Sequence, residues 1–449
     1  MVIQIPEKVN KIIKKLQEHG YDAYAVGGCV RDSLLGRTPA DWDITTSAKP
    51  LEVKGLFKRT IDTGLQHGTV TVMLNREGFE VTTYRIDGEY EDSRHPKEVI
   101  FTGKLEEDLR RRDFTINAMA YNDREGLVDV FGGAKDLKNQ IIRCVGEPRE
   151  RFTEDALRIL RAVRFSAQLG FAIEEDTAKA AGELAVSLRK ISAERIHTEL
   201  VKLLVSPHPA YLRTAWKLGI TKVVLPEFDA MMDTPQNNPH HCYSVGEHTL
   251  KALEMVSDDR ILRLALLFHD MGKPEKRSTD KAGIDHFYRH QKVSADIARK
   301  IMKRLRFDND TLDKVTKLVL WHECPWECNG YSVRKVLCKI GPPLFELLLE
   351  MRRADVMAQS NFQREEKLKK LKQSQELYEE IMERQDCISL KTLADLSVPA
   401  SIRCNLEDGT VTGSICIPAD ISTIINHSIN EKNYKTDTFS THFPVHLEL

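Results

Sequence analysis

Two aspartates, Asp41 and Asp43, stand two residues apart shortly after the paired glycines of the segment AVGGCVRD. In a strand, residues two apart point to the same side, so the two carboxylates would be presented together. Close carboxylates repel each other unless a cation lies between them, and hard oxygen ligands suit Mg²⁺. Gly28 allows the backbone to approach an anionic ligand closely, and Arg31 can fork onto phosphate oxygens. The segment predicts a Mg²⁺ and phosphate site, while simple turns are the alternative for either motif taken alone.

The string EDALRILRAVRF carries the donors and acceptors needed to read a nucleobase. On a helix, Asp155 and Arg158 are three residues apart and share a face. Cytosine and adenine both present an exocyclic amine beside a ring-nitrogen acceptor, which an Asp acceptor and an Arg donor would match. Uracil and guanine would leave the same groups unpaired, at a cost of about 1–3 kcal/mol each. Arg161 and Arg164 continue the basic face toward a triphosphate, and the alternative is a solvated basic face.

The order and spacing of these strings resemble the nucleotidyltransferase superfamily with a polymerase-β-like head. Within it they are most similar to the class II enzymes, which include tRNA CCA-adding enzymes and bacterial poly(A) polymerases. The similarity covers about the first 230 residues. It implies that Asp41 and Asp43 bind Mg²⁺, that Glu80 supplies a third catalytic carboxylate, and that Gly28 and Arg31 contact the nucleotide.

The string DLRRRDFTINAMA adds further residues to the implied nucleotide site. By the same resemblance, Arg112 contacts the nucleotide, and Asp113 and Asn117 shape the sugar pocket. Residues 87–101 resemble the loop of family members that add the complete CCA sequence, which favours addition of the terminal A as well.

Histidines and aspartates recur in the second half of the sequence. The segments GEHTL, LFHDMG and RRADV place His248, the dipeptide His269-Asp270, and Asp355 in an order that resembles the HD-domain metal phosphohydrolases. The resemblance implies that these four residues bind a divalent metal, and His and Asp together suit a transition metal that activates water. His290 and His322 stand where that family places additional histidines. The alternative is an HD module kept only as a helical scaffold that faces tRNA.

Periodicity predicts the elements that must position these residues. The N-terminal segment reads as an amphipathic helix, and alternation on both sides of residues 75–78 predicts a β-hairpin. From Phe152 onward the pattern is helical, and we expect no further strands. Residues 233–241, rich in Pro and Asn, predict a linker, and the charged run at 364–384 predicts an exposed helix.

We therefore predict an α+β chain. A polymerase-β-like nucleotidyltransferase head with a mixed β-sheet is followed by an all-helical neck and body and by a helical HD domain. The expected boundaries are 1–145 for the head, 146–232 for the neck and body, 244–360 for the HD domain, and 361–449 for a charged helix and tail. The tail departs from the family's pattern from about residue 394.

Composition limits the setting in which the chain works. It has 66 Lys and Arg residues against 67 Asp and Glu residues, a net charge of −1, so local basic stripes must hold any nucleic acid. The apolar runs are far shorter than the roughly 20 residues that span a membrane. Nine cysteines without zinc-ribbon spacing indicate reduced thiols. We expect a cytoplasmic protein that does not enter membranes.

The expected function is untemplated addition of CCA to the 3′ end of tRNA from CTP and ATP, with Mg²⁺ as cofactor. Secondary phosphohydrolase activity is expected at the HD site. One rival is a poly(A) polymerase, which shares nearly all motifs of the head. A second rival is a metal-dependent phosphohydrolase whose nucleotidyltransferase half only binds tRNA. A pure RNA-binding module is least favoured, because it needs basic grooves and stacking aromatics rather than paired carboxylates.

Overall fold

The structure is a computed structural model that describes residues 2–88, 99–323, 329–384, 400–404 and 411–415. The chain divides into two compact units. The first comprises residues 1–324 and 350–367, and the second comprises residues 325–349 and 368–449. Most of the predicted CCA-type loop, its residues 89–98, and most of the tail beyond residue 394 lie outside the described residues.

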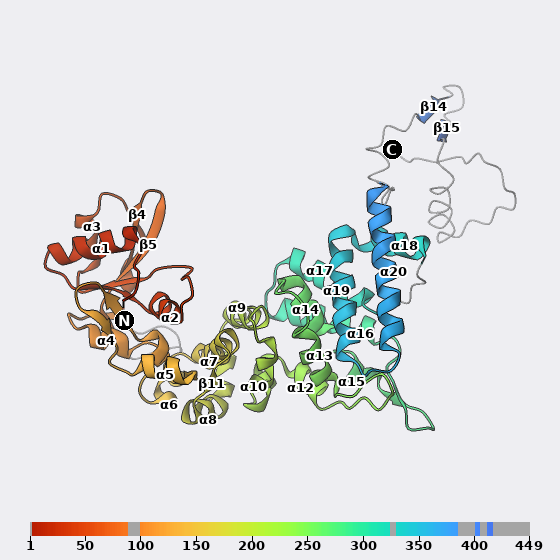
Figure 1. Cartoon of the computed structure of the whole chain (residues 1–449), viewed down its shortest axis with the longest axis horizontal. Helices are drawn as coiled ribbons and strands as arrows, with labels where there is room; N and C mark the ends of the chain where they lie inside the picture. The colour runs from red at the N-terminus through yellow and green to blue at the C-terminus, as the bar shows by residue number, and fades with distance from the viewer. Residues whose placement is uncertain (1, 89–98, 324–328, 385–399, 405–410, 416–449) are drawn as a thin grey trace. The chain divides into compact units, whose positions relative to one another are not determined.

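The head is built on a seven-stranded sheet with the strand order β3-β4-β5-β2-β1-β8-β9. Figure 1 labels two of its strands, β4 and β5, together with the head helices α1 and α3. Strands β2 and β5 are parallel and the other neighbours are antiparallel, which confirms the predicted mixed sheet. The strand bounds are β1 Ala23–Val26, β2 Ile44–Thr46, β3 Thr60–Gly64, β4 Thr69–Leu74, β5 Glu77–Thr83, β8 Ala120–Asn122 and β9 Gly126–Val128.

The predicted hairpin is confirmed as β4 and β5. Its turn lies at Asn75 and Arg76, which both have positive φ, rather than at the following glycine. Positive φ at both turn residues matches the right-handed twist of the two strands. Phe79 and Val81 are buried whereas Glu80 is exposed, as the alternation predicted.

Helices cover the head sheet and close its core. The N-terminal helix is confirmed as α1, which buries Val9, Ile12, Ile13 and Leu16. One cluster of the hydrophobic core includes Tyr24 of β1, Tyr84 directly after β5, and Leu109 of α4. The helix bounds are α1 Glu7–Glu18, α2 Gly28–Leu34, α3 Pro50–Leu56, α4 Leu105–Arg110 and α5 Gly133–Asn139. Strands β6 Arg85–Asp87 and β7 Val99–Phe101 form a separate two-stranded antiparallel sheet.

The chain then becomes helical, as predicted. The expectation that strands end there is wrong, because Ile141–Ile142 (β10) pairs in parallel with Ala172–Ile173 (β11). This short ladder ties the last head segment to the neck. The neck helices are α6 Pro148–Glu154, α7 Leu157–Leu169, α8 Glu175–Glu183, α9 Ala193–Leu204, α10 Leu212–Lys217, α11 Thr221–Val224 and α12 Pro226–Met232.

The HD region is also helical apart from the two-residue strands β12 Ser278–Thr279 and β13 Asp285–His286. The predicted linker at 233–241 forms neither helix nor strand, but it is packed rather than free. Gln236 accepts a hydrogen bond from buried Lys273, and the Asn237 amide donates to Asp285. The helices are α13 Val245–Leu253, α14 Arg260–Phe268, α15 Lys273–Lys276, α16 His290–Arg304, α17 Asn309–Trp321, α18 Gly330–Ile340 and α19 Pro342–Ala358.

The charged run is confirmed as α20, Arg364–Glu383. Inside the second unit, Tyr378 of α20 donates a hydrogen bond to Glu346 of α19. In the tail, β14 Ala400–Cys404 pairs with β15 Val411–Ile415. Across the described helices, we find none with the length and apolar character needed to cross a bilayer. The cytoplasmic location stays a prediction.

Candidate functional site

The two aspartates of the first motif lie at one end of the head sheet. The expectation that both stand on a strand is wrong, because β2 begins at Ile44 and both precede it. The backbone of Asp43 is nevertheless held by the sheet, since its carbonyl accepts a hydrogen bond from the Val26 amide at 3.0 Å. Val26 ends β1, and the paired glycines follow immediately. The end of β1 therefore lies beside Asp43 and leads directly into the glycine turn.

Strand register brings Glu80 to the same place. In the parallel pair β2 and β5, Ile44 is matched with Val81. The residues one position earlier, Asp43 and Glu80, therefore occupy neighbouring positions, and both are exposed. The third carboxylate implied by the family resemblance is thus placed beside the first two by the strand pairing.

The charges at this end of the sheet favour a bound cation. Although Asp43 is exposed as a residue, atoms packed around its carboxyl group partly exclude water and raise its pKa. The neighbouring carboxylates of Asp41 and Glu80 raise the pKa further, while Arg112 lowers it. Three carboxylates that repel one another are stabilised together by a divalent ion, and all-oxygen ligands suit Mg²⁺. The residues present therefore fit the metal that the family implies.

The glycine pair has unequal roles. Gly27 has a φ of +83°, and a Cβ there would lie 2.8 Å from Arg112 Nη1. A side chain at this position would be strained and would also displace the arginine. Gly28, which the sequence singled out, begins α2, and a Cβ there would meet only Arg31, at 3.7 Å. The close approach that needs glycine is therefore at Gly27.

A chain of polar contacts connects the head to the neck. Arg31 donates to the Asn117 side-chain oxygen at 2.7 Å, and the Asn117 amide donates to Asp113 at 3.1 Å. Asp113 then pairs with Arg161 of α7 at 2.6 Å. Four residues assigned to the nucleotide from the sequence are thus in one network, with Asn117 oriented by a donor on one side and an acceptor on the other.

We expect the Asp113→Asn variant to lose stability at neutral pH but much less in acid. Burial raises the pKa of Asp113, but Arg161 and the Asn117 amide lower it to about 2 in the folded chain. A carboxyl group with a depressed folded pKa stabilises the fold above its unfolded pKa, and this contribution is lost as pH falls toward 2. The shift corresponds to about 2 kcal/mol at pH 7. Urea unfolding of both proteins at several pH values between 7 and 3 measures the difference, and an equal difference throughout would contradict the assignment.

The base-reading pair does not lie on one helix, so that expectation is wrong. Asp155 directly follows the last residue of α6, and α7 begins at Leu157, which places Arg158 in its first turn. Asp155 pairs with Arg195 at 2.9 Å, and Arg158 pairs with Glu154 at 2.7 Å. The backbone break still leaves the two residues close, because the Arg158 amide donates to the Asp155 carbonyl.

Arg161 and Arg164 differ in their surroundings. Arg161 is half-buried and faces the head through Asp113. Arg164 is 6% exposed, forms an ion pair with Glu199 of α9, and lies over the Phe165 ring. The expectation that Arg164 continues an exposed basic face is therefore wrong, because the packing of α7 against α9 buries the Arg164 side chain.

Asp108 is a functional candidate that the sequence reasoning missed. It is fully buried, pairs with Arg111 at 2.8 Å and Arg112 at 3.5 Å, and accepts a hydrogen bond from Thr45 of β2. Asp108 thus fixes the arginines of RRRDF to the strand that follows Asp43. An acidic residue four positions before Arg112 on a helix was the available signal.

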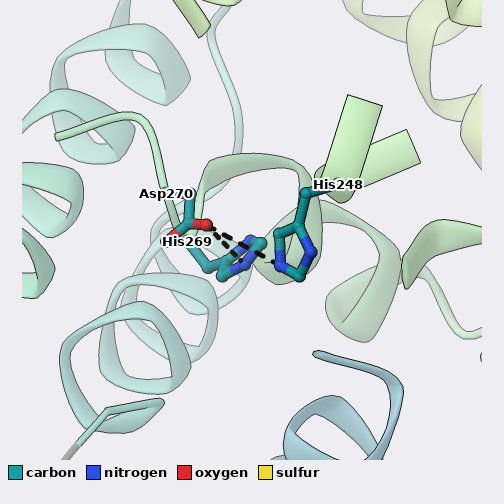
Figure 2. Close-up of side chains that lie close together, drawn as sticks. All are labelled: His248, His269 and Asp270. Atoms are coloured by element: carbon teal, nitrogen blue, oxygen red, sulfur yellow. Dashed lines mark ion pairs between the residues drawn. The ribbon is translucent and has the colours of Figure 1, made fainter. Parts of the chain in front are cut away.

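A second cluster lies in the HD region. His248 of α13 and the His269-Asp270 dipeptide after α14 point toward one another from separate elements (Figure 2). Their ligand atoms all lie within 4.8 Å of one another, and all three residues are buried. Asp355 of α19 completes the predicted set, with an oxygen 2.7 Å from His248 Nε2 and 3.5 Å from His269 Nε2.

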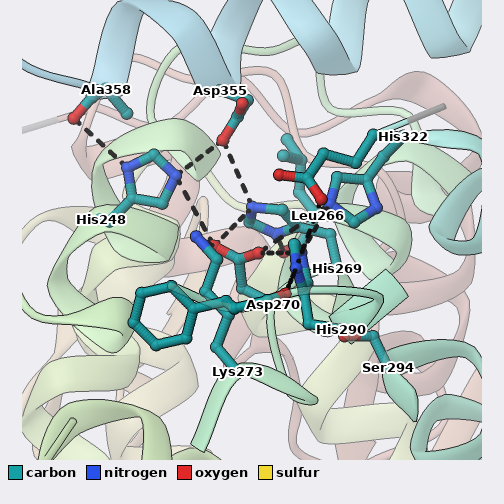
Figure 3. A network of polar contacts seen from close by, with 12 residues as sticks. His248, Leu266, His269, Asp270, Lys273, His290, Ser294, His322, Asp355 and Ala358 are labelled. Carbon is teal, nitrogen blue, oxygen red and sulfur yellow. Dashed lines mark hydrogen bonds and ion pairs between the residues drawn. The ribbon is translucent and has the colours of Figure 1, made fainter. Parts of the chain in front are cut away.

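Main-chain carbonyls orient the histidines of this cluster (Figure 3). The Nδ1 atom of each faces a backbone oxygen, which sets the proton on Nδ1 and directs Nε2 inward. The pairs are His248 with Ala358, His269 with Leu266, His290 with Phe287, and His322 with Val319. Such orientation by the surrounding shell is typical of metal-binding histidines.

Asp270 belongs to two groups at once. Its ligand atoms are also grouped with those of His290 and His322, as the resemblance implied. The two histidine Nε2 atoms are 3.2 Å apart, and His290 Nε2 lies 3.1 Å from Asp270. Because unprotonated Nε2 atoms and carboxylate oxygens are all acceptors, a proton or a metal ion must lie among them. The donor set fits a divalent transition metal.

The pKa shifts in this cluster differ between its histidines, so that His269 is favoured in its protonated form and His322 in its neutral form. Burial lowers the pKa of His269, but Asp270 and Asp355 raise it to about 10. Burial, with His269 and His290 nearby, holds the pKa of His322 well below its usual range. A metal ion that binds here displaces protons, so its affinity depends on pH.

Two residues of the cluster were missed by sequence reasoning. Lys273 is 5% exposed, and its ammonium lies 2.8 Å from Asp270, three residues earlier. Glu323 follows His322 directly and lies 3.3 Å from His290 Nδ1. The signal for both was spacing, since each falls within one helical turn of a predicted ligand.

Three segments of the chain match known family models. Residues 23–143 match the poly A polymerase head domain, residues 170–232 match a probable RNA and SrmB-binding site of polymerase A, and residues 240–388 match the HD domain. The CCA-adding enzyme of Ligilactobacillus salivarius is 51% identical over 212 residues, which cover 46% of this chain and 52% of that protein. That of Geobacillus stearothermophilus is 52% identical over 199 residues, covering 44% and 49% respectively.

The chain spans about half the length of the curated relatives it matches, whereas solved structures match over more of it. The Bacillus stearothermophilus CCA-adding enzyme in complex with CTP is 31% identical, with a TM-score of 0.61 over 83% of this chain and 82% of that one. The Thermotoga maritima CCA-adding enzyme complexed with tRNA shares the fold at 21% identity, with a TM-score of 0.53 over 82% of each chain. The head, the neck and the HD region together place this chain in the family of CCA-adding enzymes.

Proposed function

We propose that this chain adds CCA to the 3′ end of tRNA, using CTP, ATP and Mg²⁺. The observation that carries the proposal is the strand register that sets Glu80 beside Asp43, at the end of the sheet where the glycine turn begins. Paired carboxylates at a strand end, next to an arginine and a backbone that tolerates close approach, suit transfer of a nucleotidyl group.

In this proposal the tRNA 3′-oxygen forms a bond to the α-phosphorus, the bond from that phosphorus to the bridging oxygen breaks, and pyrophosphate leaves. Asp41 and Asp43 would hold Mg²⁺, which when bound neutralises the triphosphate and activates the hydroxyl. Arg31, Arg112 and Arg161 bind the phosphates and keep them in line with the attacking oxygen. Asp113 and Asn117 position two of these arginines and border the sugar.

Base selection falls to Asp155 and Arg158. Asp155 accepts from the exocyclic amine of C or A, and Arg158 donates to the adjacent ring nitrogen. Arg195 and Glu154, their present partners, keep both charges compensated when no nucleotide is bound. Addition of the terminal A also rests on the loop at 87–101, through its resemblance to complete CCA-adding members.

We expect the Arg158→Ala variant to lose selectivity for C and A. Removal of one buried hydrogen-bonding partner costs about 1–3 kcal/mol, so CTP and ATP incorporation should fall about 10–100-fold relative to UTP and GTP. Single-nucleotide incorporation rates with each triphosphate measure this ratio. Arg189→Ala, an exposed arginine of the neck, is the matched control. Unchanged ratios in the Arg158 variant would contradict base reading by this residue.

Transcripts of tRNA that end before CCA, after C and after CC test the function as a whole. Each is incubated with protein, Mg²⁺ and one labelled triphosphate at a time. The proposal expects C on the first two transcripts and A on the third. Addition of A to every transcript would favour a poly(A) polymerase, and binding without incorporation would favour a phosphohydrolase with a tRNA-binding half.

For the HD cluster we propose a divalent transition metal and hydrolysis of phosphate esters at RNA ends. His248, His269, Asp270 and Asp355 would hold the metal, which when bound supplies a hydroxide at neutral pH. The phosphorus–oxygen bond to the sugar breaks, water supplies the new oxygen, and inorganic phosphate and a free hydroxyl remain. Support comes from the carbonyl-oriented histidines and from Lys273, a buried cation beside the ligand set.

A further inference from the structure

A pocket of about 370 Å³ lies beside the HD cluster and belongs to neither proposed reaction centre. It is lined by the segment before α13, by α13, by the end of α19 and by the start of α20. Its volume lies within the range of small-molecule sites. Two of its lining residues also support metal ligands. The Ala358 carbonyl faces His248 Nδ1, and the Gln359 amide donates to Asp355 at 2.9 Å.

The charge of the lining is one-sided. Among the described residues that form the pocket, Lys251 and Arg364 are cationic, and none is Asp or Glu. Because Lys251 pairs with Glu254 outside the lining at 3.1 Å, Arg364 is the cation that faces a ligand. Arg364 donates through its terminal nitrogen to the Gln359 carbonyl, but its Nε is buried without a hydrogen-bond partner in the described part of the chain. A buried guanidinium N–H without an acceptor is costly, and a phosphate oxygen satisfies it well.

The remaining lining suits an aromatic ring. Tyr243 is 42% exposed, and the thioethers of Met255 and Met357 are exposed beside it. A tyrosine ring can stack on a nucleobase, and methionine side chains pack well against aromatic rings. A cation at the same site favours an anionic ligand. The Asn361 side chain, which also lines the pocket, can both donate and accept hydrogen bonds.

We propose that this pocket binds a terminal nucleoside phosphate, with the base against Tyr243 and the phosphate on Arg364. This deepens the proposed hydrolase activity, on which it rests, because the pocket would hold the RNA end beside the HD cluster. Gln359 connects the two sites. Its side-chain oxygen accepts a hydrogen bond from Lys367 at 2.6 Å, and this contact holds the side-chain amide in the orientation that donates to Asp355.

Cys242 gives a direct readout, because it is an exposed free cysteine that lines the pocket. The full chain is alkylated with iodoacetamide, and the rate at Cys242 is followed by peptide mass spectrometry. Cys338, also exposed but outside the pocket, is the internal control. Adenosine 3′-monophosphate at about ten times its Kd should slow Cys242 labelling about tenfold and leave Cys338 unchanged.

Variants and simpler probes separate the parts of the proposal. Arg364→Gln should raise the concentration of adenosine 3′-monophosphate needed for protection about tenfold. Arg299→Gln, an exposed arginine of α16, should not change it. Unchanged Cys242 labelling at saturating probe, or equal protection by inorganic phosphate alone, would overturn the proposal. The footprint needs no turnover, so a chain that binds the probe but hydrolyses nothing would contradict only the proposed hydrolase activity.

Discussion

Replacement of Asp43 by asparagine is expected to lower nucleotide incorporation by about 10³-fold, which corresponds to about 4 kcal/mol of transition-state stabilisation. Asp43 stands between the glycine turn and Glu80, so it is the carboxylate nearest the centre of the proposed metal site. The same change removes a charge that its neighbours repel. Thermal stability in the absence of metal should therefore be unchanged or slightly higher.

The matched control is Asp62→Asn, an exposed strand aspartate that pairs only with Lys54 among the described residues. It should retain full activity. Loss of activity in the Asp43 variant together with a lower melting temperature would indicate unfolding. Full activity with a normal melting temperature would remove Asp43 from the catalytic site.

Replacement of Asp270 by asparagine is expected to reduce divalent-metal affinity of the HD cluster by at least about 100-fold. Asp270 belongs to both groups of ligand atoms, so no other single change should affect both. CCA addition should persist, because the cluster lies far along the chain from the carboxylates of the head. Titration calorimetry with Mn²⁺ or Ni²⁺ measures the affinity, and incorporation assays run in parallel.

Two comparisons make this result specific. Asp296→Asn, an exposed residue of α16, should leave metal binding unchanged. His322→Gln removes a ligand from only one of the two groups and should have the smaller effect. Equal metal affinity in wild type and the Asp270 variant would leave the HD region as a scaffold, which is the alternative that the sequence left open.

Sequence reasoning worked where the pattern itself dictates geometry. Alternation around Asn75 sets Glu80 apart from its buried neighbours, and the glycine pair marks the end of a strand. The four residues predicted as HD ligands come from three separate elements, α13, the end of α14, and α19, so spacing alone could not bring them together. Their order was recognisable only through the family resemblance, and the structure confirms that they meet.

The errors have physical causes. The helical periodicity of the sequence continues through residues 148–169, but the helix is interrupted at Asp155, whose carboxylate pairs with Arg195. Arg164 looks like a surface residue until the packing of α7 against α9 encloses it with Glu199. Lys273 and Asp108 were missed because a buried charge is recognisable only once its partner is placed. Periodicity records which face is apolar, and it does not record which charges are paired inside.

The measurement that tests the central claim most directly is the sequence of finished 3′ ends. A tRNA transcript that lacks CCA is incubated with the protein, Mg²⁺ and all four triphosphates until extension stops, and the products are sequenced. The account predicts a single product, C, C and A in that order, with no further growth. Long runs of A, or products of mixed sequence and length, would contradict it.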